Sequence, residues 1–203
     1  MLSSYFLLCL WAEFLFDKRG QKPENCLFVQ YHAPQTGVIK DEILRQLTAT
    51  EVCKIRVVFA TVAIGIGVNI PKVRHVIHLD VPQTVEWYYQ EIGRAGWDNQ
   101  PARATVHYNG SDVASNKPGM TDEMWNYCKL TNSCLRDYVL TYLGSTRSSR
   151  PPIPRQLCCS NCSNSEQQTL KKQEVEEGSP LSKIKALWEG YLRRSKKRSV
   201  SIY

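Results

Sequence analysis

The sequence lacks the two motifs with which a P-loop enzyme holds and hydrolyses a nucleoside triphosphate. No GxxxxGK[ST] loop occurs among its 203 residues, and no DExH follows such a loop. In P-loop enzymes the first motif cradles the phosphates and the second supplies the carboxylates that hold magnesium. The absence of both excludes a P-loop nucleotidase that is complete within this sequence.

A long apolar run is also missing. Residues 5–16 (YFLLCLWAEFLF) are too short to span a bilayer, and Glu13 interrupts them. No basic residue precedes this stretch and no small-residue cleavage site follows it, so the features of a secretory signal are absent too. We therefore expect no membrane partner. The apolar residues recur at helical spacing and predict a buried helix: Leu7, Leu8, Trp11, Phe14 and Leu15.

Cysteine and positive charge are abundant by comparison. Eight cysteines without a secretory signal indicate a reducing compartment, where thiols are free or bind metal. The net charge of +7 and a pI near 9.0 point to an acidic partner. Nucleic acid is the natural candidate, but charge alone does not separate DNA from RNA or a membrane surface. A hydrophobic content of 42% suits a globular domain with a sizeable core.

Residues 57–99 carry the pattern around which the rest is organised. Two β-type apolar runs, VVFAT and VRHVIHLDV, flank a loop that contains Gly65, Gly67 and Pro71. An amphipathic helix follows, with apolar positions at i, i+3, i+4 and i+7: Val85, Tyr88, Tyr89 and Ile92. This order is typical of a parallel α/β sheet whose loops hold ligands at the strand ends. Further strands are predicted over 26–32 and 102–108, and helices over 38–47, 120–130 and 134–143.

Gln90 and Arg94 share another face of the amphipathic helix, just before a double glycine. An amide and a planar guanidinium presented together suit the recognition of a polyphosphate. A surface arginine near a helix C-terminus, favoured by the helix dipole, explains the pattern equally simply. The two residues by themselves leave both interpretations open, because short motifs often match by chance.

The surrounding strings closely resemble the RecQ family of DNA helicases. ATVAIGIGVNIPKVRHVIH resembles its motif V, YYQEIGRAGWDN its motif VI, and VQYHAPQTGVIKDEILRQL its YHA-containing segment. The resemblance implies an α/β fold: a parallel-sheet, RecA-like C-terminal helicase lobe of the P-loop NTPase type, followed by a small helical zinc-binding subdomain. It further implies a nuclear, ATP- and Mg-dependent 3′ to 5′ helicase acting on single-stranded DNA and duplex junctions. The missing motifs belong to a first RecA-like lobe, which we expect in cis or in trans.

The resemblance also assigns roles to individual residues. It places early motif V residues against the DNA backbone: Thr61, Val62, Ala63 and Gly65. It places four others at the nucleotide, two of which, Gln90 and Arg94, would be catalytic; the full set is Gly67, Asn69, Gln90 and Arg94. Motif VI departs from the family pattern QxxGRAGRDG, because Trp97 replaces the second arginine and Asn99 the last glycine. If that arginine is the finger, the neutral indole cannot replace its charge, and ATP hydrolysis should be poor.

The downstream cysteines form a partial zinc signature. Cys159 and Cys162 make a CxxC, with Cys134 upstream on a predicted helix. The arrangement resembles the RecQ zinc module, in which a helix cysteine meets CxNCxxC, but Ser165 stands at the last cysteine position. Cys158 or Cys128 could supply a fourth ligand, although adjacent Cys158 and Cys159 are not expected to face one ion easily. A metal-free site is an equal alternative.

These patterns predict three segments. Residues 1–119 form part of the second helicase lobe, residues 120–165 a degenerate zinc-binding subdomain, and residues 166–203 a polar linker with a basic tail. The basic run at 193–198 suits DNA phosphates, nuclear import or simply a solvated tail. We expect no DNA unwinding by this chain alone. The alternatives are a non-catalytic nucleic-acid-binding remnant or a lobe that complements a separate first lobe.

Overall fold

The computed structural model describes residues 28–49, 53, 55–60, 70–114, 117–146, 152–164, 189–190, 193 and 198–202. The chain divides into two compact units, Met1–Pro71 and Lys72–Tyr203. The helix predicted over residues 5–16 lies outside the described residues. Among the residues that are described, no helix combines the length and the apolar character that crossing a membrane would require.

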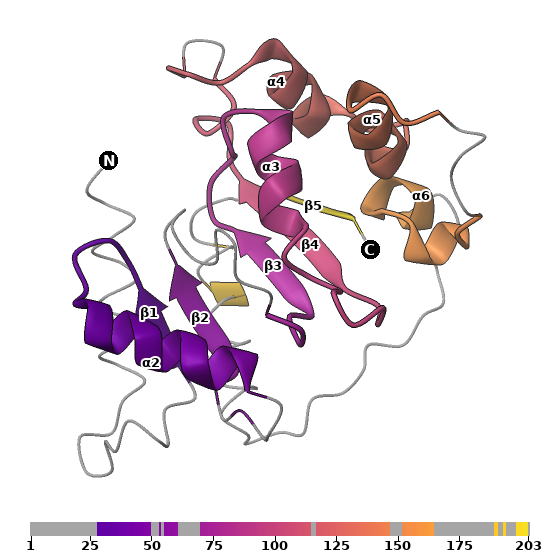
Figure 1. Ribbon diagram of the computed structural model, residues 1–203. Coiled ribbons are helices and arrows are strands. Elements are labelled where there is room, and N and C mark those ends of the chain that lie inside the picture. Colours follow the sequence, from indigo (N-terminus) through magenta and orange to yellow (C-terminus); the bar gives the residue numbers. More distant parts are fainter. Residues whose placement is uncertain are drawn as a thin grey trace. The chain divides into compact units, whose positions relative to one another are not determined.

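The first unit is a βαβ arrangement. Strand β1 (Phe28–Tyr31) runs parallel to β2 (Val57–Ala60), with Phe28 opposite Val57, and helix α2 (Gly37–Thr48) connects them (Figure 1). The helix turns its apolar stripe to the strands, so that Tyr31, Ile43 and Ile55 are buried together. The strands and the helix predicted in this region are confirmed.

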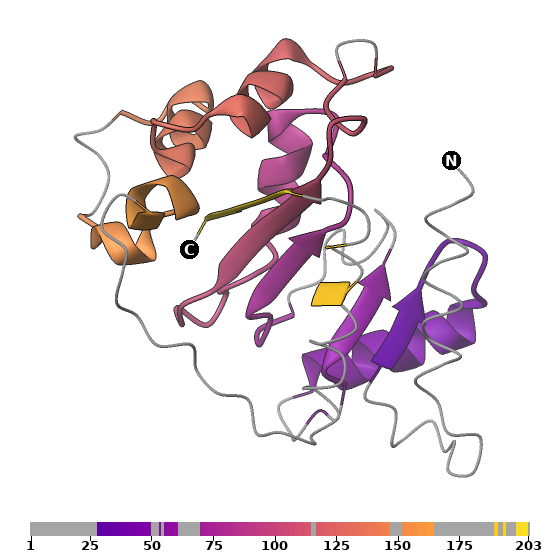
Figure 2. The same ribbon diagram turned by 180° about the vertical axis from the view of Figure 1, so that it is seen from behind.

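The second unit contains a three-stranded sheet in the order β3-β4-β5. Strand β3 (His75–His78) is parallel to β4 (Arg103–Tyr108), and β4 is antiparallel to β5 (Arg198–Ile202). Helix α3 (Val85–Ile92) joins β3 to β4 and covers one face of the sheet, as Figures 1 and 2 show from opposite sides. The predicted α/β organisation with parallel strands is therefore confirmed.

Strand β5 differs from the expectation for the C-terminal segment. Its residues were assigned to a basic tail, yet all five residues of β5 pair with β4, from Ala104 opposite Ile202 to Tyr108 opposite Arg198. The sequence RSVSI alternates polar and apolar residues, which is the strand period. Five residues beside a strongly basic run give too short a pattern to reveal a strand without its partner.

The two faces of this sheet differ in chemistry. Val106 and Tyr108 of β4 point to the helices with Val200 and Ile202 of β5, and all four are buried. The opposite face carries hydroxyls and imidazoles that bond across the strands. Thr105 Oγ1 lies 3.0 Å from Ser201 Oγ and 2.9 Å from His75 Nε2, and His107 Nδ1 lies 2.7 Å from Ser199 Oγ. Burial, helped by Arg103, lowers the pKa of His75 to about 4, so its ring is neutral.

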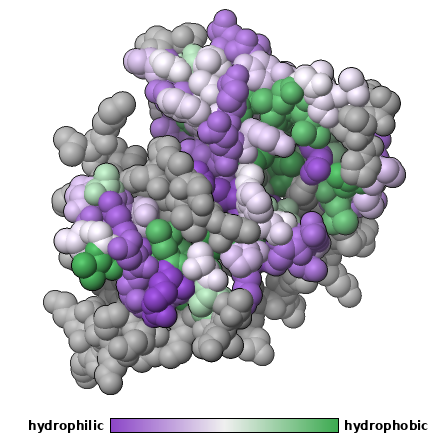
Figure 3. All heavy atoms as spheres, in the orientation of Figure 1, coloured by the Kyte–Doolittle hydropathy of each residue, from purple (hydrophilic) through white to green (hydrophobic). Residues whose placement is uncertain are grey.

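The described part of the second unit contains further helical segments after β4. They are α4 (Asp122–Lys129), α5 (Leu135–Tyr142), the single 3-10 turn η3 (Arg155–Leu157) and α6 (Ser160–Asn164). The Thr121 hydroxyl caps α4 by accepting a hydrogen bond from the Met124 N–H. The negative charge of Asp122 in the first turn interacts favourably with the positive end of the helix dipole. Hydrophobic residues gather over α5 and α6 on the face seen in Figure 3. Leu143 and Leu157 are exposed large hydrophobic residues of this unit.

The core of this unit is built on stacked tyrosines. Tyr88 of α3 and Tyr127 of α4 are both fully buried, with ring centroids 5.2 Å apart, and the Tyr127 hydroxyl donates to the Tyr88 hydroxyl at 3.0 Å. Burial raises the pKa of both phenols, so neither ionises near neutral pH. Tyr138 of α5 continues the stack at 6.2 Å from Tyr127.

We predict that Tyr127→Phe destabilises the second unit, because it removes the only proton that Tyr127 donates to Tyr88 while leaving the ring in place. The expected loss in the free energy of unfolding is about 1 kcal/mol, measured by urea denaturation. Tyr89→Phe is the matched control. Tyr89 lies next to Tyr88 on helix α3, but its side chain is 44% exposed. Equal losses in the two variants would contradict this role of the buried hydroxyl.

Candidate functional site

The C-terminal end of α3 presents Gln90 and Arg94. Gln90 is exposed and Arg94 is partly exposed, in the turn that follows the helix. The Gly93 N–H donates to the Tyr89 carbonyl at 2.9 Å, and the Arg94 N–H donates to the Glu91 carbonyl at 3.3 Å. These bonds prolong the helical path by one tight turn, so that Arg94 follows the helix end within one turn of Gln90. The arrangement suits an anionic ligand.

Gly96 shapes the turn after Arg94. Its φ of 79° lies in the left-handed region, and its N–H donates to the Val73 carbonyl just before β3 at 3.1 Å. A salt bridge between Arg74 and Asp98 holds the far side of the same turn. The hydrogen bond from Arg74 is the main reason that the pKa of the Asp98 carboxyl is lowered. The turn is thus anchored to the segment just before β3 at Gly96 and again at Asp98.

Trp97, at the position of the missing arginine, is 58% exposed on this anchored turn. Trp87, on the outer side of α3, is 52% exposed. Tyr89 was predicted to face the sheet with Val85 and Tyr88, but it is 44% exposed. The eight-residue helix touches the core along a narrow strip that includes Val85 and Tyr88, and Tyr89 falls on its flank.

The other residues assigned to nucleotide or DNA lie outside the described part of the chain. These are the motif V residues Thr61, Val62, Ala63, Gly65, Gly67 and Asn69. Their roles remain predictions. Ser165, at the position of the missing cysteine, is also outside the described residues.

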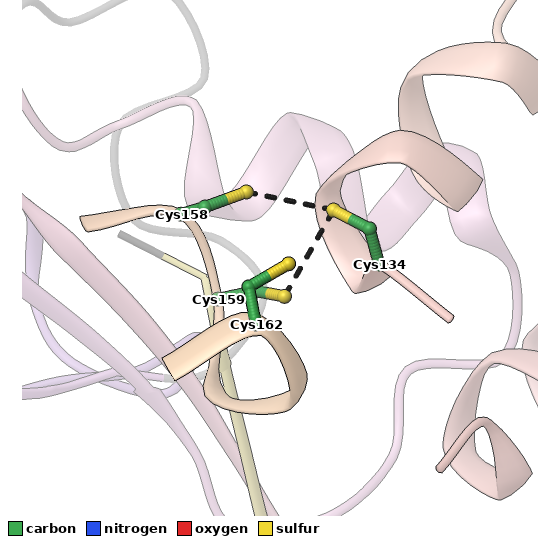
Figure 4. Close-up of side chains that lie close together, drawn as sticks. All are labelled: Cys134, Cys158, Cys159 and Cys162. Atoms are coloured by element: carbon green, nitrogen blue, oxygen red, sulfur yellow. Dashed lines mark hydrogen bonds between the residues drawn. The ribbon is translucent and has the colours of Figure 1, made fainter. Parts of the chain in front are cut away.

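Four cysteines converge in the second unit (Figure 4). The sulfur atoms of Cys134, Cys158, Cys159 and Cys162 all lie within 4.8 Å of one another. Cys134 Sγ is 3.5 Å from Cys158 Sγ and 3.9 Å from Cys159 Sγ. A tetrahedral zinc ion with Zn–S bonds of about 2.3 Å separates its sulfur ligands by about 3.8 Å. The residues therefore fit a structural zinc site in number, type and spacing.

Cys158, one of the two candidates for a fourth ligand, completes the cluster, although adjacent Cys158 and Cys159 were not expected to face one ion easily. Side chains of adjacent residues diverge in extended chain, but Cys158 closes the turn η3 with φ −94° and ψ −66°. Cys159 then leads directly into α6. The change of direction between the two short helices aims both sulfurs at one point. Cys128, the other candidate, is buried in the core and is not part of the cluster.

Backbone and side-chain hydrogen bonds position these cysteines. Cys134 is the N-cap of α5, and its sulfur accepts the Asp137 N–H at 3.3 Å. The side-chain amide of Asn161 donates to the carbonyls of Leu130 and Ser133, at 3.1 and 2.9 Å. Asn161 therefore joins α6 to the loop before Cys134. Its place between Cys159 and Cys162 was visible in the sequence, but its partners were not.

The thiols respond differently to this environment. Burial, together with the hydrogen bond to Cys134, raises the pKa of Cys158 to about 11. Burial also opposes ionisation of Cys159, but N–H donors from Cys162 and Leu135 outweigh it and lower the pKa of that thiol. The environment of the cluster thus lowers the pKa of one thiol, Cys159, and raises that of its neighbour Cys158.

Comparison with known proteins agrees with both parts of this site. Residues 8–98 match the helicase conserved C-terminal domain, and residues 100–166 match the RecQ zinc-binding domain. The chain is 33% identical to the ATP-dependent helicase SGS1 of Saccharomyces cerevisiae over 179 residues, which are 78% of this chain and 12% of that protein. The ATP-dependent DNA helicase RecQ of Haemophilus influenzae is 34% identical over 146 residues, 65% of this chain and 22% of that protein.

The chain belongs to the RecQ helicase family. The RecQ-like DNA helicase BLM of Xenopus laevis is a further relative, 30% identical over 159 residues, which are 68% of this chain and 11% of that protein. The chain spans between 11% and 22% of the length of these three relatives. The predicted fold, a RecA-like helicase C-terminal lobe followed by a RecQ zinc-binding region, is confirmed.

We predict that Gly96→Ala destabilises the RecQ motif VI turn. A Cβ at Gly96 would lie 3.4 Å from the Ala102 Cβ, and a φ of 79° is unfavourable for alanine by about 1 to 2 kcal/mol. Urea denaturation should show a loss of that size. Gly110→Ala is the control, because a Cβ at Gly110 meets nothing within 4 Å. A Gly96→Ala protein as stable as Gly110→Ala would show that the turn is not fixed.

Proposed function

We propose that this chain supplies the second RecA-like lobe of a RecQ-type DNA helicase, which moves 3′ to 5′ and unwinds duplex DNA with ATP and Mg. The observation that carries the proposal is the RecQ motif VI turn, which presents Gln90 and Arg94 at the surface on a backbone anchored through Gly96. Arg94 would contact the nucleotide phosphates, Gln90 would position the nucleotide, and Gly67 and Asn69 would face its sugar. Thr61, Val62, Ala63 and Gly65 would contact single-stranded DNA.

Nucleotide hydrolysis would need a first lobe, supplied in cis or in trans. A P-loop and the magnesium-binding carboxylates of a DExH motif are absent from the sequence. The chain would therefore contribute only the second-lobe side of a nucleotide site. Arg94 would add a positive charge to that side of the site. We infer that no unwinding occurs without the first lobe. The basic run at 193–198 supports a nuclear location near DNA.

A second candidate is a non-catalytic nucleic-acid-binding remnant or a complementing lobe with weak hydrolysis. The exposed Trp97 favours it, because an indole at the position of a finger arginine brings no charge to a developing phosphoryl transition state. The aromatic ring would leave nucleotide contact by Arg94 intact while removing most of the rate enhancement. The two candidates differ in turnover once a first lobe is present.

We predict that Trp97→Arg restores DNA-stimulated ATP hydrolysis when a RecQ-type first lobe is supplied separately. An arginine finger contributes about 10³ to 10⁵ in rate, so turnover should rise by at least about 10³ over the unmodified chain. Trp87→Arg adds the same charge at an equally exposed indole on α3 and serves as the control.

The outcomes separate the candidates. Turnover by the unmodified, complemented chain would support a working helicase lobe despite Trp97. Turnover by the unmodified chain without any added lobe would contradict the requirement for a first lobe. Equal activity in Trp97→Arg and Trp87→Arg would show that position 97 does not face the phosphates.

We further propose that the four-cysteine cluster holds a structural zinc ion, with Cys134, Cys158, Cys159 and Cys162 as ligands. Four thiolates suit a closed tetrahedral site. Bound zinc would tie the start of α5 to α6, in addition to the bonds that Asn161 makes to the loop before Cys134. Cys158 would take the place that Ser165 leaves open in the RecQ pattern.

Replacing Cys158 by alanine tests this ligand set. Cys158→Ala should weaken zinc binding by more than the about 10- to 100-fold that loss of an outer-shell partner costs, in competition with a chromophoric chelator. Cys128→Ala should leave the affinity unchanged, because Cys128 lies outside the cluster. The reverse order of effects would make Cys128 the fourth ligand.

A further inference from the structure

We infer that the C-terminal strand β5 positions the cysteine cluster, so that metal binding and the docking of β5 strengthen each other. The inference rests on the zinc site proposed above and adds an element to it. Strand β5 lies at residues 198–202, beyond the helicase domain matched over 8–98 and the zinc-binding domain matched over 100–166. Neither match accounts for this strand.

The backbone makes the first connection. Cys159 and Ile202 form an isolated antiparallel bridge, which extends the sheet from β5 to the residue before α6. Beside it, the Ser201 N–H donates to Ser160 Oγ at 3.2 Å. The end of β5 is therefore hydrogen-bonded to the segment that carries Cys159 and Cys162, as its position beside α6 in Figure 1 also shows.

Apolar packing makes the second connection. Val200 and Ile202 are buried in the same cluster as Cys159 and Leu135, which are both fully buried. Leu135 directly follows Cys134 at the start of α5. Strand β5 thus packs against both segments that carry sulfurs, the start of α5 and the start of α6.

The cluster depends on such support because its own scaffold is small. Helix α6 has five residues, fewer than a helix needs to be stable without tertiary contacts. Outer-shell partners that orient metal ligands are typically worth about 10- to 100-fold in affinity. Binding energies that are coupled are reciprocal, so bound metal must stabilise the docked strand by the same factor.

The decisive variant is Ser201→Pro. The Ser201 N–H points to Ser160 rather than to β4, and proline is tolerated on an edge strand where the N–H does not join the ladder. Ser160→Ala removes the acceptor of the same bond. Ser201→Ala keeps the N–H donor and is the conservative control. Ser199→Pro is the positional control. It places a proline two residues earlier on the same side of β5, opposite His107 of β4 and away from Ser160.

The experiment measures zinc affinity of the full chain by chelator competition, and the Co(II) absorption of the thiolate site. We expect a 10- to 100-fold loss of affinity and weaker thiolate-to-cobalt bands in Ser201→Pro and Ser160→Ala. Ser201→Ala and Ser199→Pro each remove a hydroxyl bonded to β4 but leave the N–H of residue 201 free to bond Ser160, so both should lose less affinity than Ser201→Pro. An equal loss in Ser199→Pro would show a general effect on folding and overturn the inference.

Hydrogen exchange in the unmodified chain tests the coupling without any substitution. Zinc should slow hydrogen exchange of the Val200 and Ile202 amides by the same factor by which Ser201→Pro lowers the zinc affinity. The exchange rate of the Val29 amide in β1 should not change. If the unmodified chain binds zinc but neither β5 exchange nor the Ser201→Pro affinity changes, the inference is overturned and the zinc site stands. If the unmodified chain binds no zinc, both are overturned.

Discussion

The contact between Tyr88 of α3 and Tyr127 of α4 is the interaction on which the rest of the second unit depends. Tyr88 belongs to the helix that ends in the motif VI turn, and Tyr127 belongs to the helices that lead to the cysteines. A second link runs parallel to it, because the Tyr142 hydroxyl of α5 donates to the Glu86 carboxylate of α3 at 2.6 Å. The motif VI turn and the cysteine cluster are therefore built on one continuous core.

This core explains why a zinc site would matter to a helicase lobe at all. Zinc contributes no chemistry to phosphoryl transfer in a closed four-thiolate site, but it fixes the helices that carry its ligands. Helix α4 in turn holds α3 through the buried pair Tyr88 and Tyr127, and Tyr138 of α5 packs against Tyr127. If zinc occupies the cluster as proposed, its loss would loosen the scaffold behind Gln90 and Arg94 without touching either residue.

Much of this organisation was predictable, because it depends on local spacing. Strands β1 to β4, helices α2 to α5, and the grouping of Gln90 with Arg94 follow from periodicities of two and 3.6 residues. The convergence of Cys134 with Cys159 and Cys162 followed from the family resemblance. Tyr89 was misplaced because a four-residue apolar repeat on a short helix does not show which flank meets the sheet.

The sequence by itself determined the family, the α/β order and the departures at Trp97 and Ser165, because these are properties of residue identity and spacing. Only the tertiary structure decided that Cys158 joins the cluster, because its direction depends on the backbone turn at the end of η3. Only the tertiary structure placed β5 beside β4 and α6, because strand pairing joins residues about ninety positions apart and has no local signal.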